Sequence, residues 1–409
     1  MKISDNPVRT HREIVAVTLA VGTAPWQKTL AASLLSAGML RRFLSSDPNL
    51  EIQEPNGNGS LEEIKRFPLH RVINRLLWGA WRRFPRKWRR WSPVMPMALM
   101  KDHWWSRWIP PCNVFHGWMG QSLASIRAAK RQGAVTLVEN PGRHPGHFHS
   151  APWKECDRFN IKDSERSPLL PTALIRRMER EYQICDRIVV PSTLAYGSFA
   201  EFGLGEKAVV VFPGVDDQFF LPPRPRERPP VFRVCFAGRV ELSKGAGYLL
   251  QAWKRMALPN AELVLAGEVR PEMNALLETH ADSSVHKLGF LSLRELVKAY
   301  QDSDLFVFPS VNEGFAQVLL EAMSCGLPVV ATELSGANDC VTEGKEGFIV
   351  PARDVDRLAE AILWCHEHRD ETRAMGRAAR ARIESQFTLD HYNQRMIALY
   401  KELASQQPE

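Results

Sequence analysis

Two glutamates eight residues apart, Glu313 and Glu321, bracket an otherwise apolar stretch of the sequence. The run 304–310 (DLFVFPS) before them has the short apolar character of a buried strand, and 317–323 (QVLLEAM) has that of a helix. With a helix that begins near Phe315, Glu321 lies about two turns inside it on the buried side. An unpartnered buried carboxylate costs roughly several kcal/mol. The sequence therefore predicts a hydrogen-bonding partner for Glu321.

A second candidate site occupies 236–250 (FAGRVELSKGAGYLL), which has the pattern of a strand, a glycine turn and a helix. Arg239 and Lys244 lie in the turn, and Gly238 lets the backbone approach a ligand closely. A helix N-terminus with two cations suits a diphosphate, whereas solvated loop cations are the alternative interpretation. Gly267 ends another predicted strand in the same way.

The helix near Phe315 provides another N-terminus at the same predicted sheet edge, which makes a nucleotide-diphosphate site plausible. Glu321 then has a natural partner, because a carboxylate can accept two hydrogen bonds from ribose hydroxyls. Glu313, at the turn, would face whatever is attached beyond the diphosphate.

Strands and helices alternate along the chain, which is typical of parallel sheets with helices on both faces. The predicted strands are 13–20, 134–139, 186–192 and 208–214, then 232–238, 261–267, 304–310 and 327–332; the predicted helices include 246–256, 292–301 and 355–368. The segments 186–192 and 304–310 share the order Asp, apolar run, Pro, Ser, which indicates either chance or two similar halves that face each other. A proline- and charge-rich linker is expected at 221–230.

The composition is that of a globular protein: 409 residues, 44% of them hydrophobic, are enough for two domains. No apolar run approaches the ~20 residues that span a bilayer. The N-terminus lacks the layout of a signal peptide. The seven cysteines are scattered, which argues against a disulfide framework or a zinc site and predicts a cytoplasmic location.

The segment 70–108 concentrates basic and aromatic residues, with ten Lys or Arg, one acidic residue and seven of the twelve tryptophans. Three interpretations remain open. It is a solvated basic face whose tryptophans enter the core, an interfacial element on an anionic bilayer, or a nucleic-acid contact. The last is the weakest, because no nucleic-acid module accompanies it.

Three histidines, His144, His147 and His149, follow the predicted strand 134–139. A metal cluster is one interpretation, but the neighbouring prolines and glycines disfavour its geometry. Exposed loop histidines are the plainer interpretation.

Several motifs together resemble the retaining glycosyltransferases of family four, which have the two-domain GT-B fold. E-G-F-x4-L-E-A-M-x-C-G-L-P-V-V-A-T is similar to the family's E-x7-E signature, and G-R-x4-K-G is similar to its phosphate-binding turn. The resemblance covers roughly residues 110–405 and includes 185–192, 210–220, 334–354 and 387–403.

This resemblance implies an α/β fold of two Rossmann-like, doubly wound domains that face each other across a cleft. It implies these units: an acceptor-binding domain 1–220, a linker 221–230, a nucleotide-sugar-binding domain 231–385, and a C-terminal helix 386–409 that packs back on the first domain.

The resemblance also implies roles for the charged residues. Arg239 and Lys244 hold the donor diphosphate and offset the charge that develops as it leaves. Glu321 binds the ribose hydroxyls. Glu313 holds the transferred sugar. His144 contacts that sugar as a neutral imidazole and shields the oxocarbenium-like centre.

The other implied donor-site positions act through their backbone. Gly314, Phe315 and Ala316 form the turn at which N–H groups meet the β-phosphate, and Gly238 and Gly267 end neighbouring strands. The base is expected against Gly289, Phe290 and Leu291.

The acceptor side departs from the family pattern. His116 is a second candidate there, and Gly22 begins a Gly-Thr-Ala-Pro run where a glycine pair is expected. Ala316 stands where glycine is common, and Ser335-Gly336 replaces a glycine pair, which affects the shape of the sugar pocket.

The expected activity is hexosyl transfer with retention, from a nucleotide-diphosphate sugar to a sugar or lipid-linked acceptor, in glycolipid, exopolysaccharide or lipopolysaccharide assembly. Neither metal nor cofactor is expected, because the resemblance implies that protein groups stabilise the leaving group electrostatically. Asp302-Ser303-Asp304 superficially matches a metal-binding DxD, but it precedes a strand, whereas that motif follows one. The expected location is cytoplasmic and peripheral at the inner membrane face, without nucleic acid. The alternatives are a sugar-nucleotide epimerase and a catalytically silent, membrane-associated binding subunit. The sequence does not identify the base, the sugar or the acceptor.

Overall fold

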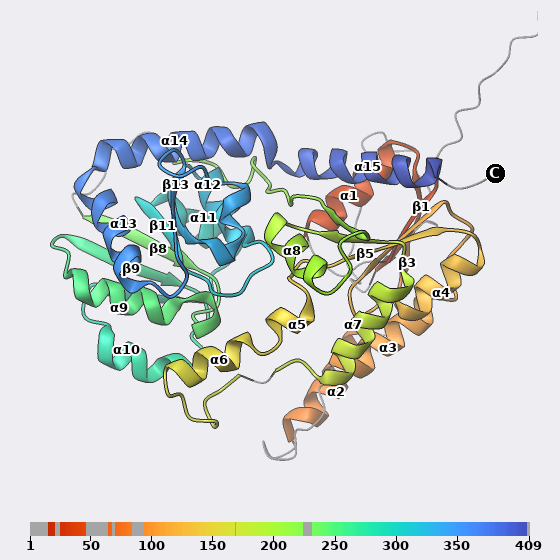
Figure 1. Ribbon diagram of the computed structural model, residues 1–409, viewed down its shortest axis with the longest axis horizontal. Coiled ribbons are helices and arrows are strands. Elements are labelled where there is room, and N and C mark those ends of the chain that lie inside the picture. Colours follow the sequence, from red (N-terminus) through yellow and green to blue (C-terminus); the bar gives the residue numbers. More distant parts are fainter. Residues whose placement is uncertain are drawn as a thin grey trace, which may run out of the picture.

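The protein consists of two parallel sheets, one on each side of the molecule, with helices on both faces of each sheet (Figure 1). The computed structural model describes residues 15–20, 25–45, 64–67, 70–83, 94–167, 169–223 and 231–406. The expected linker at 221–230 lies mostly outside the described residues.

The first sheet has seven strands in the spatial order β3-β2-β1-β4-β5-β6-β7. Its strands are β1 (Val17–Ala20), β2 (Leu40–Ser45), β3 (Ile64–Arg66), β4 (Val114–Trp118), β5 (Val135–Glu139), β6 (Arg187–Val190) and β7 (Ala208–Val210). Its helices are α1 (Pro25–Ser36), α2 (His70–Arg83), α3 (Val94–Trp105), α4 (Leu123–Arg131), α5 (Pro145–Phe148), α6 (Ala151–Arg158), α7 (Thr172–Ile184) and α8 (Thr193–Glu201).

The second sheet has six strands in the order β10-β9-β8-β11-β12-β13. Its strands are β8 (Phe232–Ala237), β9 (Ala261–Ala266), β10 (Val285–Gly289), β11 (Leu305–Phe308), β12 (Val329–Thr332) and β13 (Gly347–Val350). The helices that follow are α9 (Ala246–Met256), α10 (Asn274–His280), α11 (Leu293–Gln301), α12 (Gln317–Ser324), α13 (Val355–Glu367), α14 (Arg369–Gln386) and α15 (Leu389–Ser405). Short 3-10 turns include η3 (Leu242–Lys244) and η5 (Glu333–Ser335).

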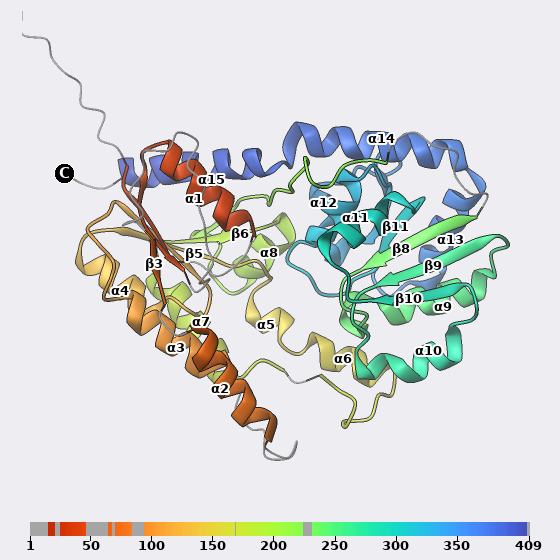
Figure 2. The same ribbon diagram turned by 180° about the vertical axis from the view of Figure 1, so that it is seen from behind.

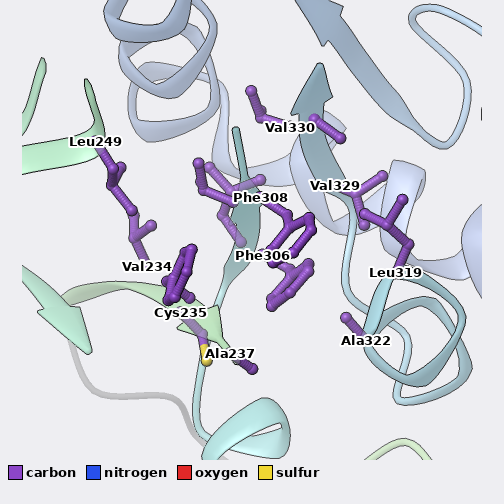
Figure 3. Packing of buried hydrophobic residues seen from close by; sticks show 14 of the residues in the cluster. Val234, Cys235, Ala237, Leu249, Phe306, Phe308, Leu319, Ala322, Val329 and Val330 are labelled. Atoms are coloured by element: carbon purple, nitrogen blue, oxygen red, sulfur yellow. The ribbon is translucent and has the colours of Figure 1, made fainter. Parts of the chain in front are cut away.

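The centre of the second sheet is apolar on both faces. Val234 on β8 lies beside β11, where the rings of Phe306 and Phe308 stack with centroids 6.1 Å apart (Figure 3). Leu319 of α12 and Val329 of β12 close the same cluster. A strand covered by helices on both faces must be continuously apolar, which is why these segments were recognisable as strands.

Both sheets reverse their strand order at one point, between β1 and β4 and between β8 and β11. Ligands of doubly wound sheets bind in the crevice at such a switch point, outside the carboxyl ends of the strands. The two carboxyl edges meet: the Ser192 hydroxyl, after β6, donates to the Gly314 carbonyl, after β11, at 2.5 Å. The expected arrangement of two doubly wound units facing each other is therefore confirmed.

Two segments cross between the halves. Helices α14 and α15 run along one side of the molecule, α14 over the second half and α15 over the first (Figures 1 and 2). Tyr392, Met396 and Tyr400 of α15 join a core cluster with residues of β1 and α1. In the opposite direction, Glu155 of α6 is buried against the second half, where it accepts a hydrogen bond from the Tyr248 hydroxyl at 2.5 Å.

Among the residues that the structure describes, no helix is long and apolar enough to cross a membrane. All seven cysteines carry free thiols.

Candidate functional site

Three glycines line the carboxyl edge of the second sheet. Gly238 follows β8 with a φ of 123°, a conformation that side chains rarely adopt. A Cβ on Gly267, after β9, would lie 1.8 Å from the Gly238 carbonyl oxygen, and Gly267 also forms a bridge to Gly289 at the end of β10. The turns after three adjacent strands therefore pack closely, and their backbone is available to a ligand.

The turn between β8 and α9 carries the two predicted cations. The Arg239 side chain is 61% exposed and pairs with Glu241 at 3.1 Å. The Lys244 ammonium instead forms an ion pair with the Glu313 carboxylate, which comes from the loop after β11. A Cβ on Gly245 would lie 1.8 Å from the Pro309 carbonyl oxygen, so only glycine lets the turn approach β11 this closely.

Glu313 is fixed from two sides. Its N–H donates to the Leu334 carbonyl at 3.1 Å, and its carboxylate accepts from the Ser310 hydroxyl at 3.3 Å as well as from Lys244. The structure thus joins Lys244 and Glu313, which lie 69 residues apart in the chain. An anion at Lys244 would compete with Glu313 for the same ammonium, so ligand entry and the orientation of Glu313 are coupled.

The glycine turn before α12 contacts the first half. Helix α12 begins at Gln317, two residues later than expected, and Ala316 is its N-cap. The Ala316 N–H donates to the Ser335 carbonyl at 2.9 Å, so it is not free for the β-phosphate as the resemblance implied. A Cβ on Gly314 would lie 2.3 Å from the Pro141 carbonyl oxygen, which shows how closely the halves approach here.

Glu321 lies half-buried on α12, and its partner in the structure is a residue that the sequence did not reveal. The Tyr300 hydroxyl of α11 donates to its carboxylate at 3.0 Å. Burial raises the pKa of Glu321 to about 7, and the hydrogen bond from Tyr300 opposes this rise. Among the residues that the structure describes, no second donor contacts this carboxylate, so one of its oxygens can accept from a ligand. Tyr300 falls in the predicted helix 292–301. A tyrosine that a helix buries needs a partner for its hydroxyl, and this was the one hint in the sequence that Tyr300 pairs with another side chain.

The residues expected against the base lie at the end of β10. The Phe290 side chain is 89% exposed, whereas Leu291 is half-buried. They share the sheet edge with Gly238 and Gly267, so a ligand along this edge can reach them.

On the first half, His144 is the N-cap of α5 and is buried. Its Nδ1 accepts from the Gly146 N–H at 3.2 Å, and its ring stacks on Phe202 with centroids 3.9 Å apart. Burial lowers the pKa of His144 to about 4, so the imidazole is neutral at pH 7 with its proton on Nε2. The neighbouring His147 instead contacts the Glu201 carboxylate, with its Nε2 2.6 Å from a carboxylate oxygen.

The structure does not bring His116 to the cleft. The residue is fully buried in β4, where its Nδ1 lies 2.7 Å from the Tyr400 hydroxyl and its Nε2 lies 3.4 Å from the Glu139 carboxylate. His116 therefore serves to hold α15 on the sheet. Gly22, the other acceptor-side prediction, lies outside the described residues.

The cavity between the two halves is narrow, about 60 Å³, and is lined by residues from both, among them Trp26, Glu139, Pro141, Phe315 and Gln317. The amide of Gln317, one of the lining residues, donates to the Gly214 carbonyl at 2.6 Å. Small-molecule sites typically enclose about 300–1,000 Å³, so this cavity by itself is too small to hold a sugar. In the described part of the chain, no three His, Cys, Asp or Glu side chains gather as a metal site would require.

Comparisons with known proteins agree with this geometry. Residues 231–368 match the family model described as "Glycosyl transferases group 1". A Corynebacterium glutamicum protein named GDP-mannose-dependent monoacylated alpha-(1-6)-phosphatidylinositol monomannoside mannosyltransferase is 28% identical over 45% of this chain and 53% of that protein. The chain spans about half the length of the curated relatives it matches.

Solved structures resemble the chain over nearly its whole length. Sucrose-phosphate synthase from Thermosynechococcus elongatus superposes with a TM-score of 0.66 at 18% identity, and the superposition covers 96% of this chain and 99% of the synthase chain. Anabaena HepE in complex with UDP superposes with a TM-score of 0.62 at 15% identity, and the superposition covers 95% of this chain and 100% of the HepE chain. The predicted GT-B fold is therefore confirmed.

Proposed function

We propose that this chain, which belongs to the family-four glycosyltransferases of the GT-B fold, moves a hexose from a nucleotide-diphosphate donor to an acceptor hydroxyl with retention of configuration. The observation that supports this best is the pairing of Lys244 with Glu313 at the switch point of the second sheet. A cation and a carboxylate held together where a ligand is expected suit a donor whose diphosphate is anionic and whose sugar carries hydroxyls.

In this proposal the diphosphate lies at the carboxyl edge, between Gly238 and the turn before α12. Lys244 exchanges Glu313 for the phosphates and offsets the negative charge that grows as the diphosphate leaves. The freed Glu313 carboxylate accepts hydrogen bonds from the sugar. Glu321, whose carboxylate keeps one oxygen for a second donor beside Tyr300, accepts from the ribose.

The first half supplies the opposite face of the sugar. The neutral His144 donates from Nε2 to a sugar hydroxyl, and no histidine charge opposes the positive charge that develops at the anomeric carbon. The acceptor hydroxyl attacks on the face from which the diphosphate departs, so the leaving group takes up its proton. Closure of the two halves excludes water, which would otherwise hydrolyse the donor.

We also propose that the acceptor is lipid-linked and that α2 rests on an anionic membrane. Val72 and Leu76 on this helix are 51% and 66% exposed, and Arg75 beside them is exposed. Exposed apolar residues next to basic ones on one helix suit an interfacial position. The tryptophans of 70–108 do not all lie at the surface, since Trp105 of α3 is fully buried in the core.

Vesicle flotation tests the membrane contact. We expect the protein to float with anionic vesicles at moderate salt, and the variant Leu76→Asp to float less. Leu293→Asp, at a comparably exposed leucine of the second half, is the matched control and should float like the wild type. Failure of the wild type to float even at low salt would remove this part of the proposal.

The transferase reaction is tested by proton NMR of the purified protein with UDP-, GDP- and ADP-sugars and an alkyl glycoside acceptor. The proposal predicts an α-linked product from an α-linked donor. A β-linked product would contradict retention. A new nucleotide sugar formed without an acceptor would indicate an epimerase, and nucleotide binding without turnover would indicate a binding subunit.

A further inference from the structure

A separate apolar pocket lies in the first half, between α2, α3, α7 and the turn from β4 to α4. It encloses about 350 Å³, within the size range of small-molecule sites. Three methionines line it, one from each of three elements: Met97 on α3, Met119 in the turn and Met178 on α7. Methionine side chains are unbranched and adaptable, so such walls suit a flexible apolar chain.

One cation, Lys101 of α3, lines this pocket and is only 8% exposed. Its ammonium lies 5.7 Å from the centroid of the Trp105 ring, and no carboxylate of the described residues pairs with it. Desolvation lowers its pKa to about 8, so it is still mostly charged at pH 7. A buried ammonium beside a ring lacks the anion that would compensate its lost hydration.

Unlike Lys101, the nearby carboxyl groups of Asp102 and Glu181 have hydrogen-bonding partners. Asp102, the next residue, accepts from the Ala124 N–H at 2.7 Å and the Ser125 N–H at 2.9 Å, and it pairs with Arg177. Glu181 accepts from the Gly120 and Ser122 N–H groups of the turn. These contacts fix the turn that forms one wall of the pocket, so the pocket is preformed.

The pocket adjoins the cleft between the halves. Trp118 lines the pocket, and its ring lies 6.4 Å from the ring of Trp26, which lines the narrow cavity at the cleft. On its other side the pocket is lined by Trp78 of α2, the helix with the exposed apolar and basic residues. A molecule in the pocket would thus lie between α2 and the cleft.

We propose that this pocket binds the acceptor, a lipid phosphate, with its apolar chain among the methionines, its phosphate on Lys101 and its attacking hydroxyl toward the cleft past Trp118 and Trp26. The acceptor role rests on the proposed transferase function. The binding itself rests on the pocket and on Lys101, with which no carboxylate of the described residues pairs.

Monododecyl phosphate is a suitable probe, and dodecanol is its uncharged counterpart. Isothermal titration calorimetry measures both on the full chain. For Lys101→Met we expect at least about tenfold weaker binding of dodecyl phosphate, because one charge-assisted contact is lost, and unchanged binding of dodecanol. Lys154→Met, at an exposed lysine of α6, is the matched control and should bind both probes like the wild type.

A variant that fills the pocket provides the second test. Met119→Trp should lose both probes. Leu170→Trp replaces another partly buried lining residue and serves if Met119→Trp does not fold. Equal affinity for dodecyl phosphate in the wild type, in Lys101→Met and in a folded pocket-filling variant would overturn the proposal, as would the absence of binding to the wild type.

Nucleotide binding by the same proteins separates this proposal from the transferase. An intact response to a nucleoside diphosphate with no lipid binding would overturn the pocket and leave the donor site standing. Lipid binding with no response to any nucleotide would overturn the acceptor role together with the proposed function.

Discussion

The two sheet edges that meet at the cleft differ in the side chains that they offer to a ligand. The edge of the second sheet is charged and built on close turns, with Arg239 and Lys244 between β8 and α9 and Glu313 after β11. The edge of the first sheet presents a neutral histidine, His144, held by stacking on Phe202. The difference fits a donor that is strongly anionic at one end and carries only hydroxyls at the other.

The edges also differ in how they are supported. The turns of the second edge are fixed by backbone contacts, since a Cβ on Gly245 or Gly267 would collide with a carbonyl oxygen. The first edge is supported by side chains from distant parts of the chain, such as Tyr400, which contacts His116 from 284 residues away. Changes to the second edge should therefore affect donor chemistry, and changes to the first should affect stability or closure.

We expect the largest loss of activity from a change that disturbs the contact between the two edges. Gly314→Ala places a Cβ 2.3 Å from the Pro141 carbonyl oxygen, so the halves cannot close as seen here. Because small misplacements of reacting groups cost up to roughly 100-fold, we expect kcat/KM to fall by that order. Gly197→Ala on α8, where a Cβ meets nothing within 4 Å, is the matched control. Unchanged kinetics in Gly314→Ala would mean that this closure is not used in turnover.

The charged edge should show the next largest effect. Lys244→Ala removes the cation that we propose faces the leaving diphosphate, and we expect kcat/KM to fall at least about 30-fold, equivalent to about 2 kcal/mol of transition-state stabilisation. Steady-state kinetics with a nucleotide sugar measure this. Lys345→Ala, at an exposed lysine, should leave the rate unchanged. Wild-type turnover in Lys244→Ala would contradict the site assignment.

The pH dependence of donor affinity sharpens the role of Glu321. Its pKa is raised to about 7, so the carboxylate that we propose accepts from ribose is lost as the pH falls through this value. Affinity for a nucleotide sugar should therefore weaken about tenfold from pH 8 to pH 6. Tyr300→Phe removes the hydrogen bond that lowers the pKa, so the transition should move to higher pH. Glu321→Gln should abolish the transition, and a profile that stays the same in Glu321→Gln would assign it to another group.

The smallest expected effect on transfer comes from the supporting side chains of the first edge. His116→Leu removes the contact with the Tyr400 hydroxyl and leaves this buried hydroxyl unsatisfied, which costs about 1–3 kcal/mol of unfolding free energy. Thermal denaturation should show a lower Tm, while kcat/KM per folded molecule should not change. Loss of transfer without loss of stability would place His116 at the acceptor after all.

Local patterns in the sequence were enough to predict parallel sheets covered by helices, and the resemblance to the family-four glycosyltransferases added the two doubly wound domains. Strands β8, β9, β11 and β12 are short apolar runs because helices cover both faces of the sheet. Two of the strands that were missed are polar or interrupted. β10 is an edge strand with three exposed residues, and the central strand β4 contains His116 and Gly117. A buried histidine is stabilised by Tyr400 from the far end of the chain, which no local pattern reveals.

The charged edge was predictable for a related reason. Its residues lie in turns whose glycines are required by the backbone, so their spacing is visible in one short stretch. The ion pair of Lys244 with Glu313, the partner Tyr300 and the contact of Gly314 with Pro141 depend on how strands distant in the sequence pair. The commitment of the Ala316 N–H to Ser335 depends on the same tertiary approach.

The most direct test of the donor site is a thermal-shift measurement of the wild type and Lys244→Ala with UDP, GDP and ADP and their sugar conjugates. A ligand at 100 times its dissociation constant stabilises the folded state by about 2.7 kcal/mol. The account predicts a rise in Tm with one base for the wild type, and a much smaller rise for Lys244→Ala. No rise with any nucleotide, or an equal rise in both proteins, would contradict the assignment of this sheet edge as the donor site.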